Sequence, residues 1–389
     1  MTFPRRVEAI PITRPAGTLA FRTILTQGPL SRVEVGRRTG LSAAAVTNAV
    51  RPLIDGAYLV EDRAPEGAIG RPAAPLHVWP ERAYFVGVKV TAEDVIGVVV
   101  DLQARVRTVH TRELRGKDVE SVVGAVEELV DELVARDDQF RSRIRGLGVS
   151  LSGDVDTEVG IVRYSPFLDW REVRLAEIIA DRTGLPTTVD NDVRALTRAE
   201  QWFGAGNGAS AFVMVTVGSG IGCGIVVNGS VISGVHGVTG EIGHLTIDAA
   251  APERCHCGNQ GCLEAIASDP AIIRQINALP DAHVDSPAEA AALAHSGHEG
   301  ARAIYARAGR AIGLGLAAVV NLVGPERVII SGEGVAAYDL FEQHVRATFA
   351  RHAFSTADNC EIIVCPLGFD EWARGAATVA LEAFISPTR

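Results

Sequence analysis

The most informative part of the chain is residues 255–264, which read Cys255-His256-Cys257-Gly258-Asn259-Gln260-Gly261-Cys262-Leu263-Glu264. Three cysteines fall within eight positions, and a histidine precedes the first of them by eleven. Three thiolates and one imidazole complete a closed tetrahedral zinc site, and the two glycines allow turns tight enough to point the sulfurs inward. The sequence therefore predicts one structural Zn²⁺ per chain, bound by His244, Cys255, Cys257 and Cys262. Three free thiols in a reducing compartment are the alternative.

Strands and helices alternate on both sides of this segment. The first half holds a predicted β-hairpin, a helix and a strand, at residues 84–89 with 95–100, 119–133 and 147–150. The second half repeats that order at residues 212–217 with 224–227, 301–322 and 328–330. A hairpin–helix–strand plan used twice predicts an α/β duplication with two lobes and a cleft between them.

A polar cluster, Asp190-Asn191-Asp192, follows the strand-like segment 185–189 and precedes a predicted helix. Sugar hydroxyls need paired donors and acceptors, so amides, carboxylates and imidazoles on rigid turns are the expected lining of a sugar site. A cluster that only caps the following helix is an equally sound interpretation of these three residues.

The first 80 residues read as a winged helix-turn-helix, with a small protein-binding helical domain as the alternative. Thr18 is expected to cap a first helix, and Ser31-Arg32-Val33-Glu34 has the form of a capping box that opens a second. Gly40 supplies the turn, Ser42 caps the recognition helix, and Pro52 is expected to end or kink it. Two strands, at 58–60 and 75–79, flank a wing tip at 67–71.

Charge separates this head from the rest of the chain. Residues 1–80 hold ten arginines, no lysine and six acidic residues, a net charge of +4, whereas the remainder carries −14. A basic head on an acidic body favours contact with a polyanion such as double-stranded operator DNA. The predicted DNA-binding residues are polar positions of the recognition helix and the wing tip: Ser42, Thr47, Asn48, Arg51 and Arg71.

The overall composition excludes several classes of protein. Hydrophobic residues make up 47% and charged residues 22%, which argues against disorder. No apolar run is expected to reach the ~18–20 residues that span a bilayer, and the N-terminus lacks the apolar region of a signal peptide. Six cysteines in a chain this long do not form a disulfide framework. A cytoplasmic protein without membrane contact is therefore expected.

Taken together, the head and the cysteine segment resemble the ROK family of repressors, open reading frames and sugar kinases. The matching stretches are Gly28-Pro29-Leu30-Ser31, Thr39-Gly40-Leu41-Ser42, Gly70-Arg71-Pro72, and Gly240-Glu241-Ile242-Gly243-His244 followed by residues 255–264. The resemblance spans nearly the whole chain. It implies a winged helix-turn-helix over 1–80 and a duplicated, actin-like sugar-sensing domain over 81–389, with a zinc loop over 244–262.

The resemblance also implies a sugar in the cleft between the lobes. Five residues match the family's sugar ligands: Asn191, Asp192, Glu241, His244 and Glu264. His244 would then serve both metal and sugar through different ring nitrogens. In the family's kinases the residue matching Asp192 is also the general base. Phe167 and Ser152 depart from the usual pattern near the sugar, so the sugar itself stays open.

The nucleotide half of the family pattern is altered. Kinases of the family carry Asp-x-Gly-Gly-Thr on the first hairpin, where the glycines let the backbone approach phosphate. Here Lys89 replaces the acid, and Thr91 and Ala92 replace the glycines. Glu333 adds negative charge in Ser331-Gly332-Glu333-Gly334, whereas the glycine loop 218–222 is intact. The sequence therefore predicts a sugar sensor with no catalytic residues and no kinase activity.

These features together predict a sugar-responsive transcriptional regulator, most simply a repressor of carbohydrate uptake and catabolism genes. A helix-turn-helix head reads two half-sites related by two-fold symmetry, so a homodimer or a dimer of dimers is expected. An active, ATP-dependent sugar kinase with a DNA-binding head, and a regulator that binds no sugar, are the alternatives.

Overall fold

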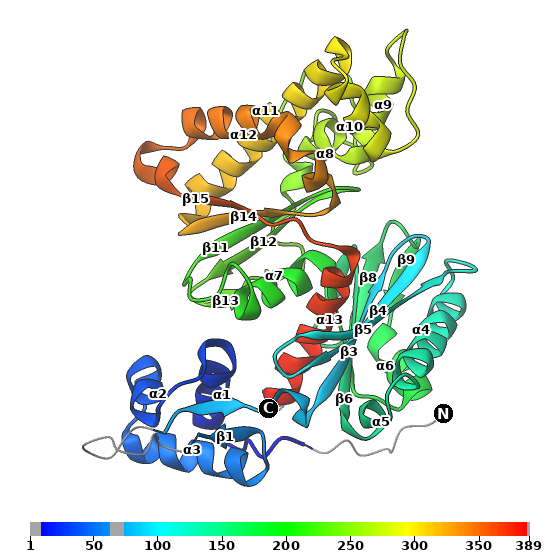
Figure 1. Cartoon of the computed structure of the whole chain (residues 1–389). Helices are drawn as coiled ribbons and strands as arrows, with labels where there is room; N and C mark the ends of the chain where they lie inside the picture. Colours follow the sequence, from blue (N-terminus) through cyan, green and yellow to red (C-terminus); the bar gives the residue numbers. More distant parts are fainter. Residues whose placement is uncertain (1–8, 63–73, 387–389) are drawn as a thin grey trace. The chain divides into compact units, whose positions relative to one another are not determined.

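The computed structural model describes residues 9–62 and 74–386 (Figure 1). Contacts between residues divide the chain into two compact units, one formed by Met1–Asn207 with Asp370–Arg389 and the other by Gly208–Phe369. The head predicted over residues 1–80 belongs to the first unit, together with a five-stranded sheet and the C-terminal helix.

Three helices and a two-stranded antiparallel sheet form the head: α1 (Pro15–Gln27), α2 (Arg32–Thr39), α3 (Ala43–Asp55), β1 (Leu59–Glu61) and β2 (Leu76–Val78). The predicted capping box is present, because the Ser31 hydroxyl accepts from the Glu34 amide while the Glu34 carboxylate accepts from the Ser31 amide. Gly40, with φ 72°, ends α2, and Ser42 caps α3. Element order and caps match a helix-turn-helix; the expected wing tip and Arg71 lie outside the described residues.

The expected cap of the first helix is wrong, and so is one of the two outcomes expected at Pro52, an end of the helix. Helix α1 begins at Pro15, whose fixed φ suits a first turn, and Thr18 is not its cap. The Thr18 hydroxyl instead donates to the Ile385 carbonyl at 3.2 Å. Pro52 does not end α3, which continues to Asp55. Since Pro52 is exposed, water can satisfy the carbonyl that lost its partner in the preceding turn.

A mixed sheet of order β10-β6-β3-β4-β5 lies at the centre of the first unit. Its strands are β3 (Tyr84–Val90), β4 (Asp94–Asp101), β5 (Val106–Glu113), β6 (Ile144–Leu151) and β10 (Thr187–Asn191). Strands β3 to β5 are antiparallel, whereas β6 joins β3 and β10 joins β6 in parallel. Strands β3 and β6 are buried throughout, which explains their largely apolar sequences; Lys89 in β3 and Arg145 and Ser150 in β6 are buried polar exceptions.

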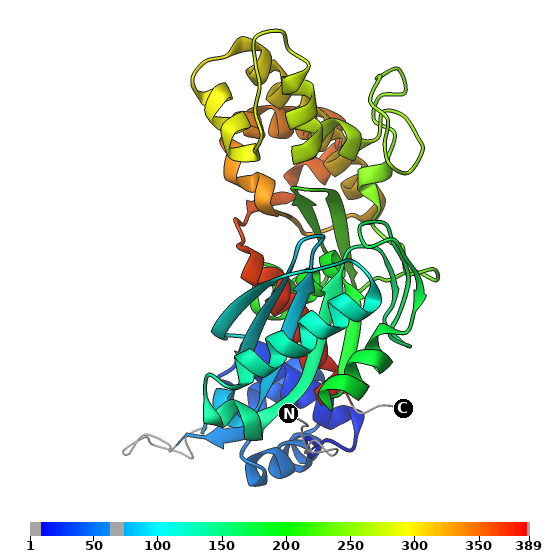
Figure 2. The same ribbon diagram turned by 90° about the vertical axis from the view of Figure 1, so that its right-hand side faces the viewer.

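Helices and a small antiparallel sheet complete the first unit. They are α4 (Val119–Val134), α5 (Asp138–Arg143), α6 (Leu175–Thr183), α7 (Asp192–Phe203), α13 (Phe369–Ile385), β7 (Asp154–Asp156), β8 (Ile161–Ser165) and β9 (Trp170–Val173). Helix α13 packs with its backbone against β3 and β6, because a Cβ on Gly87 or Gly148 would collide with a carbonyl of that helix. Figures 1 and 2 show α13 against this sheet from two sides.

The second unit repeats the first sheet in the order β13-β12-β11-β14-β15. Its strands are β11 (Phe212–Val217), β12 (Ile221–Val227), β13 (Ser230–Val231), β14 (Arg327–Ser331) and β15 (Glu361–Val364). Strands β11 to β13 are antiparallel, whereas β14 joins β11 and β15 joins β14 in parallel. Strand order and direction therefore correspond one to one between the units, and the predicted α/β duplication is confirmed.

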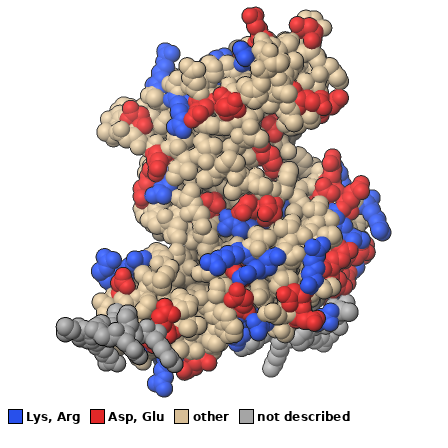
Figure 3. Space-filling view, in the orientation of Figure 1, with Lys and Arg blue, Asp and Glu red and all other residues tan. Residues whose placement is uncertain are grey.

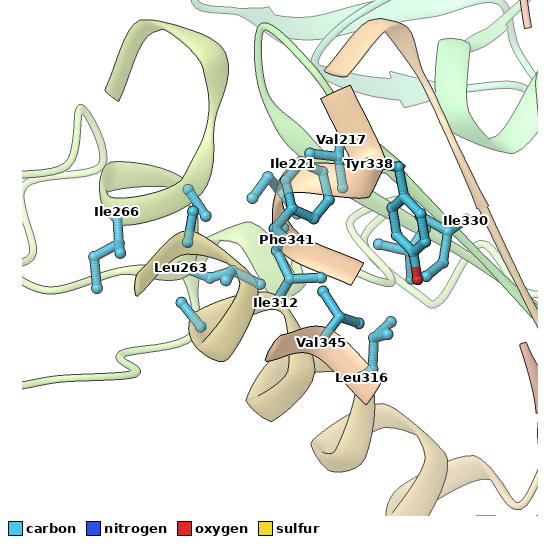
Figure 4. Packing of buried hydrophobic residues seen from close by; sticks show 14 of the residues in the cluster. Val217, Ile221, Leu263, Ile266, Ile312, Leu316, Ile330, Tyr338, Phe341 and Val345 are labelled. Atoms are coloured by element: carbon cyan, nitrogen blue, oxygen red, sulfur yellow. The ribbon is translucent and has the colours of Figure 1, made fainter. Parts of the chain in front are cut away.

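Helices pack around a large apolar core in the second unit: α8 (Leu263–Ala267), α9 (Asp269–Asn277), α10 (Pro287–His295), α11 (Glu299–Val323) and α12 (Tyr338–His352). In Figure 4, Ile312 and Leu316 of α11 point towards Phe341 and Val345 of α12. By length and composition alone, α11 could cross a membrane, with a mean hydropathy of 1.4. However, 61% of that window is buried, as in the core helix of a soluble domain.

Candidate metal centre and ligand-binding residues

The four predicted zinc ligands come together in the second unit. One donor atom from each of His244, Cys255, Cys257 and Cys262 lies within 4.8 Å of all the others. The Cys257 and Cys262 sulfurs are 3.8 Å apart, and Cys255 Sγ is 3.4 Å from His244 Nδ1. Tetrahedral zinc with ordinary bond lengths places two sulfurs about 3.8 Å apart and a sulfur and a nitrogen about 3.5 Å apart. The donor set thus fits Zn²⁺ in both identity and spacing.

Local backbone geometry explains why this segment folds into a donor cluster. Gly258 and Gly261 have φ of 92° and 68°, in the left-handed region that glycine tolerates. A Cβ on Gly261 would also collide with the Asp248 carbonyl. The Cys255 amide donates to Asn259 O at 2.9 Å, closing the turn. Both glycines are therefore required by the loop, as the sequence suggested.

A second polar cluster adjoins the first and uses His244 again. His244, His256 and Glu264 offer donor atoms that all lie within 4.8 Å of one another. His256 Nδ1 lies 3.1 Å from Glu264 Oε1, and His244 Nε2 lies 3.9 Å from Glu241 Oε2. Since His244 Nδ1 faces Cys255, its two nitrogens point to different clusters. The second unit therefore brings together its three predicted sugar ligands, and the exposed His256 adds a fourth polar side chain to the group.

The other two predicted sugar ligands lie where β10 passes into α7, in the first unit. Asn191 caps α7, with its side-chain oxygen accepting from the amides of Val193 and Arg194 at 3.0 and 3.2 Å. Its side-chain nitrogen donates to Gly153 O at 3.1 Å. The helix-cap interpretation therefore holds for Asn191. It does not account for Asp192, which is buried and forms an ion pair.

Lys89 is the partner of Asp192. The Lys89 ammonium donates to Asp192 Oδ2, and each side chain is only 10% exposed. The same ammonium lies 5.2 Å from the centre of the Trp372 ring. Asp192 Oδ1 accepts from the Val193 amide at 2.9 Å, so both carboxylate oxygens are engaged. The sequence singled out both residues but gave no sign that they pair, since 103 positions separate them.

The turn between β3 and β4 is closed by the side chain of one of its own residues, Thr91. Thr91 Oγ1 accepts from the amides of Glu93 and Asp94 at 3.2 and 2.9 Å. Backbone amides that cradle a phosphate must be free to point at it. In this turn the threonine hydroxyl already accepts from two amides, which a glycine at position 91 could not do.

Carboxylates also surround the intact glycine loop of the second unit, residues 218–222. A Cβ on Gly218 would collide with Glu333 Oε2, so that carboxylate lies directly against the loop. The Asp269 amide donates to Gly218 O at 2.8 Å, and Glu264 Oε2 accepts from the Ile221 amide at 3.0 Å. Burial and then the charge of Glu333 raise the pKa of Asp269 to about 6. The immediate surroundings of the loop are therefore acidic.

The predicted recognition helix presents a polar face to solvent. Ser42, Thr47, Asn48 and Arg51 are all exposed, whereas Val46, Val50 and Leu53 on the opposite side are buried. Arg51 forms a long ion pair with Asp55, at 4.0 Å, and 81% of its side chain is exposed. On the face drawn in Figure 3, basic and acidic side chains are interspersed. The predicted DNA-binding residues of α3 therefore share one exposed face, whereas the charges of the described residues in Figure 3 form no single basic surface.

Comparison with known proteins relates this chain to regulators and kinases of one family. The xylose repressor of Bacillus subtilis is 26% identical over 94% of this chain and 95% of its own. The DNA-binding transcriptional repressor Mlc of Escherichia coli is 30% identical over 87% and 85% of the two chains. A solved ROK family transcriptional regulator, a homologue of Escherichia coli Mlc, superposes with a TM-score of 0.81 at 26% identity, covering 95% of each chain.

A kinase of known structure matches the body of the chain but not the whole of it. The ROK family glucokinase of Streptomyces griseus, solved with glucose and AMPPNP, gives a TM-score of 0.66 at 26% identity. It covers 77% of this chain and 99% of its own. The model of the ROK family matches residues 85–383, which leaves out the head. The chain therefore belongs to the ROK family.

Proposed function

We propose that this protein is a cytoplasmic, sugar-responsive transcriptional regulator that represses genes of carbohydrate uptake and catabolism and has no kinase activity. The observation that carries the proposal is the head. It has the order and caps of a helix-turn-helix, and a solved regulator of the family matches 95% of the chain, head included. The kinase relative covers only 77%.

DNA binding is assigned to the exposed side of α3. Ser42, Thr47 and Asn48 can bond to base edges or phosphates, and Arg51 to guanine or phosphate. Arg71, at the expected wing tip, is assigned to phosphate or the minor groove on the sequence alone. Two heads would read an operator with two half-sites, which requires a homodimer or a dimer of dimers.

Sugar binding is assigned to polar residues of both units: Asn191 and Asp192 in the first, and Glu241, His244 and Glu264 in the second. Each can exchange hydrogen bonds with hydroxyls. Zn²⁺ on the cysteine cluster would hold the loop from which His244 and Glu264 project and fix the orientation of the His244 ring. Structural zinc of this kind also stabilises the fold directly.

Three features support the absence of phosphoryl transfer. The Asp192 carboxylate is paired with Lys89, so it is poorly placed to accept a hydroxyl proton as a general base. Thr91 occupies amides of the first hairpin turn. Glu333 places negative charge against the second glycine loop, where a nucleotide phosphate would meet repulsion.

The experiment that tests the proposal measures linkage between sugar and DNA. An operator is first selected from a random double-stranded library with the full-length protein. Glucose, xylose and N-acetylglucosamine are then titrated into free protein and into the protein–operator complex. If a sugar lowers operator affinity by some factor, the operator must lower sugar affinity by the same factor. Equal sugar affinities in the two titrations would contradict the regulator.

Variants separate the two functions. Asp192→Ala and Glu264→Ala should weaken sugar binding by roughly tenfold or more, because a hydrogen bond to a charged group contributes about 1.5–3 kcal/mol. Glu264→Ala, which lies in the second unit, should leave operator affinity without sugar near that of the wild type. Glu113→Ala and Glu361→Ala, which remove exposed carboxylates from edge strands of the two units, are the matched controls. Arg51→Ala should weaken operator binding, reduce its salt dependence and leave sugar affinity unchanged.

A further inference from the structure

Helix α7 joins the predicted sugar ligands to the head. It begins at Asn191 and Asp192, and its last turn carries Trp202, which is buried in the same apolar cluster as α1 of the head. Four residues beyond the end of α7, Asn207 donates from Nδ2 to Thr26 O at 2.7 Å and to Trp202 O at 3.1 Å. Thr26 lies in the last turn of α1, where carbonyls lack partners within the helix. Asn207 thus bonds the end of α7 to the end of α1.

Helix α13 runs beside α7 and also reaches the head. A Cβ on Gly375 would lie 2.8 Å from the Leu196 amide nitrogen, so the two helix backbones touch. Ion pairs hold them together on either side of this contact: Arg374 with Glu200 at 3.2 Å, and Arg198 with Glu382.

Like α7, helix α13 has one end near the Lys89–Asp192 pair and the other end at the head. Trp372, in its first turn, faces the Lys89 ammonium that is paired with Asp192. In its last turn, the Phe384 ring lies 6.1 Å from that of Tyr58 in the head, and Ile385 O accepts from Thr18. Each helix therefore extends from the Lys89–Asp192 pair to the head.

The chain also passes between the two units at these helices. It leaves the first unit after Asn207, at Gly208, which has φ 82°, and re-enters at Asp370 in the first turn of α13. Any change in the arrangement of the units must be absorbed by these two connections, since no other covalent link joins them. A close-packed helix pair transmits such a change as a rigid body rather than by bending.

We propose that Asn207 is a positioning residue, which transmits the state of the sugar-binding residues and of the inter-unit connection to the helix-turn-helix head. The inference rests on the proposed function and names the route of its regulation. A merely structural role for Asn207 predicts altered stability with an unchanged response to sugar. Transmission instead predicts that the response of operator affinity to sugar changes, because the bond to Thr26 then differs in strength between the sugar-free and sugar-bound states.

Two variants of Asn207 and one control separate these roles. Asn207→Ala removes the donor, and Asn207→Asp keeps the shape while placing a carboxylate against two carbonyl oxygens. Arg82→Gln is the control, since Arg82 Nε donates to Gly56 O of the head at 2.9 Å but lies on neither helix. Measured quantities are sugar affinity, and operator affinity with and without saturating sugar, using the selected operator and the sugar that shifts the wild type's thermal unfolding.

The compared quantity is the ratio of operator affinity without sugar to operator affinity with saturating sugar. In both Asn207 variants this ratio should fall at least about threefold towards one, which is the effect of losing one neutral hydrogen bond. Sugar affinity of the free protein should stay within about twofold of the wild type, and Arg82→Gln should keep the wild-type ratio. A wild-type ratio in both Asn207 variants, or an equal loss in Arg82→Gln, overturns the inference.

A second readout needs neither sugar nor DNA, so it decides the inference even if the regulator function fails. Asp192→Ala removes the carboxylate from the first turn of α7, and hydrogen–deuterium exchange is followed over residues 15–27 of α1. Exchange over residues 15–27 should be faster in Asp192→Ala than in the wild type, and unchanged in the control Glu113→Ala. In an Asn207→Ala background, introducing Asp192→Ala should cause no further acceleration. The same added effect in both backgrounds would show that the signal bypasses Asn207.

Discussion

Replacing Lys89 by Met should destabilise the first unit strongly, because it leaves the Asp192 carboxylate buried without its counter-ion. Both side chains are 10% exposed, so solvent can replace little of the lost interaction. Breaking a buried ion pair by removing one partner typically costs about 3–5 kcal/mol. The contact with the Trp372 ring adds roughly 0.5–1 kcal/mol to the loss. A domain of this size loses about 2–4 °C in Tm per kcal/mol, so the combined loss of roughly 3.5–6 kcal/mol corresponds to a fall of about 7–24 °C.

The assay is differential scanning calorimetry together with urea unfolding followed by circular dichroism. Arg174→Met is the matched control, since Arg174 pairs with Glu177 at 3.0 Å but both side chains are more than half exposed. Its cost should stay below about 1 kcal/mol. Adding Asp192→Asn to Lys89→Met should restore much of the lost stability, because the unpaired charge is removed. A loss below about 1 kcal/mol in Lys89→Met, or a double variant no more stable than the single one, would refute the reasoning.

Elemental analysis of protein purified without added metal should find about one zinc per chain, and Cys257→Ser should lose both the metal and stability; unchanged zinc in that variant contradicts the assignment. In an assay coupled to ADP release, turnover with Mg-ATP and hexoses, pentoses or amino sugars should stay at background, whereas saturable turnover of about 1 per second or faster would show a kinase. The native pKa of Asp269 is raised from 3.8 to about 6, so its stabilising contribution is complete below about pH 4 and is lost as pH rises through 6. Urea unfolding should therefore show a decline of about 1–3 kcal/mol in the second unit between pH 4 and 7 that Asp269→Asn abolishes, and equal pH dependence in the two proteins would contradict it.

Local chemistry carried most of what the sequence predicted correctly. The capping box at Ser31, the left-handed Gly40 and the cap at Ser42 depend on residues within four positions of one another. The two hairpin–helix–strand repeats depend on side-chain periodicity, and the grouping of His244 with the three cysteines depends on chemical identity at short spacing, while zinc binding by that group stays a prediction. The two errors in the head are also local: Thr18 suits a cap, but Pro15 starts the helix earlier, and an exposed Pro52 is tolerated.

What the sequence could not predict depends on pairs far apart in the chain. Lys89 and Asp192 are 103 residues apart, and Asn207 and Thr26 are 181 apart. Neither pair has a spacing that periodicity could detect. The return of α13 to the first unit is likewise a matter of packing, since it depends on small residues at Gly87, Gly148 and Gly375 that admit a helix backbone. The unexpected contact of His256 with Glu264 depends on how the zinc loop turns.

The duplicated fold explains why the proposed absence of kinase activity rests on features of both units. Strands β3 and β4 correspond to β11 and β12, so their turns occupy equivalent places in the two sheets. In the first turn the Thr91 hydroxyl accepts from two amides, and Lys89, in the strand before it, is paired with the Asp192 carboxylate. In the second, the glycines are intact but Glu333 lies against them. Restoring an acid at position 89 alone would set a second carboxylate beside Asp192 and leave Glu333 in place. A substitution in one unit alone, such as Lys89→Asp, should therefore lower stability without producing phosphorylation of a sugar, because a different side chain closes the turn in each unit.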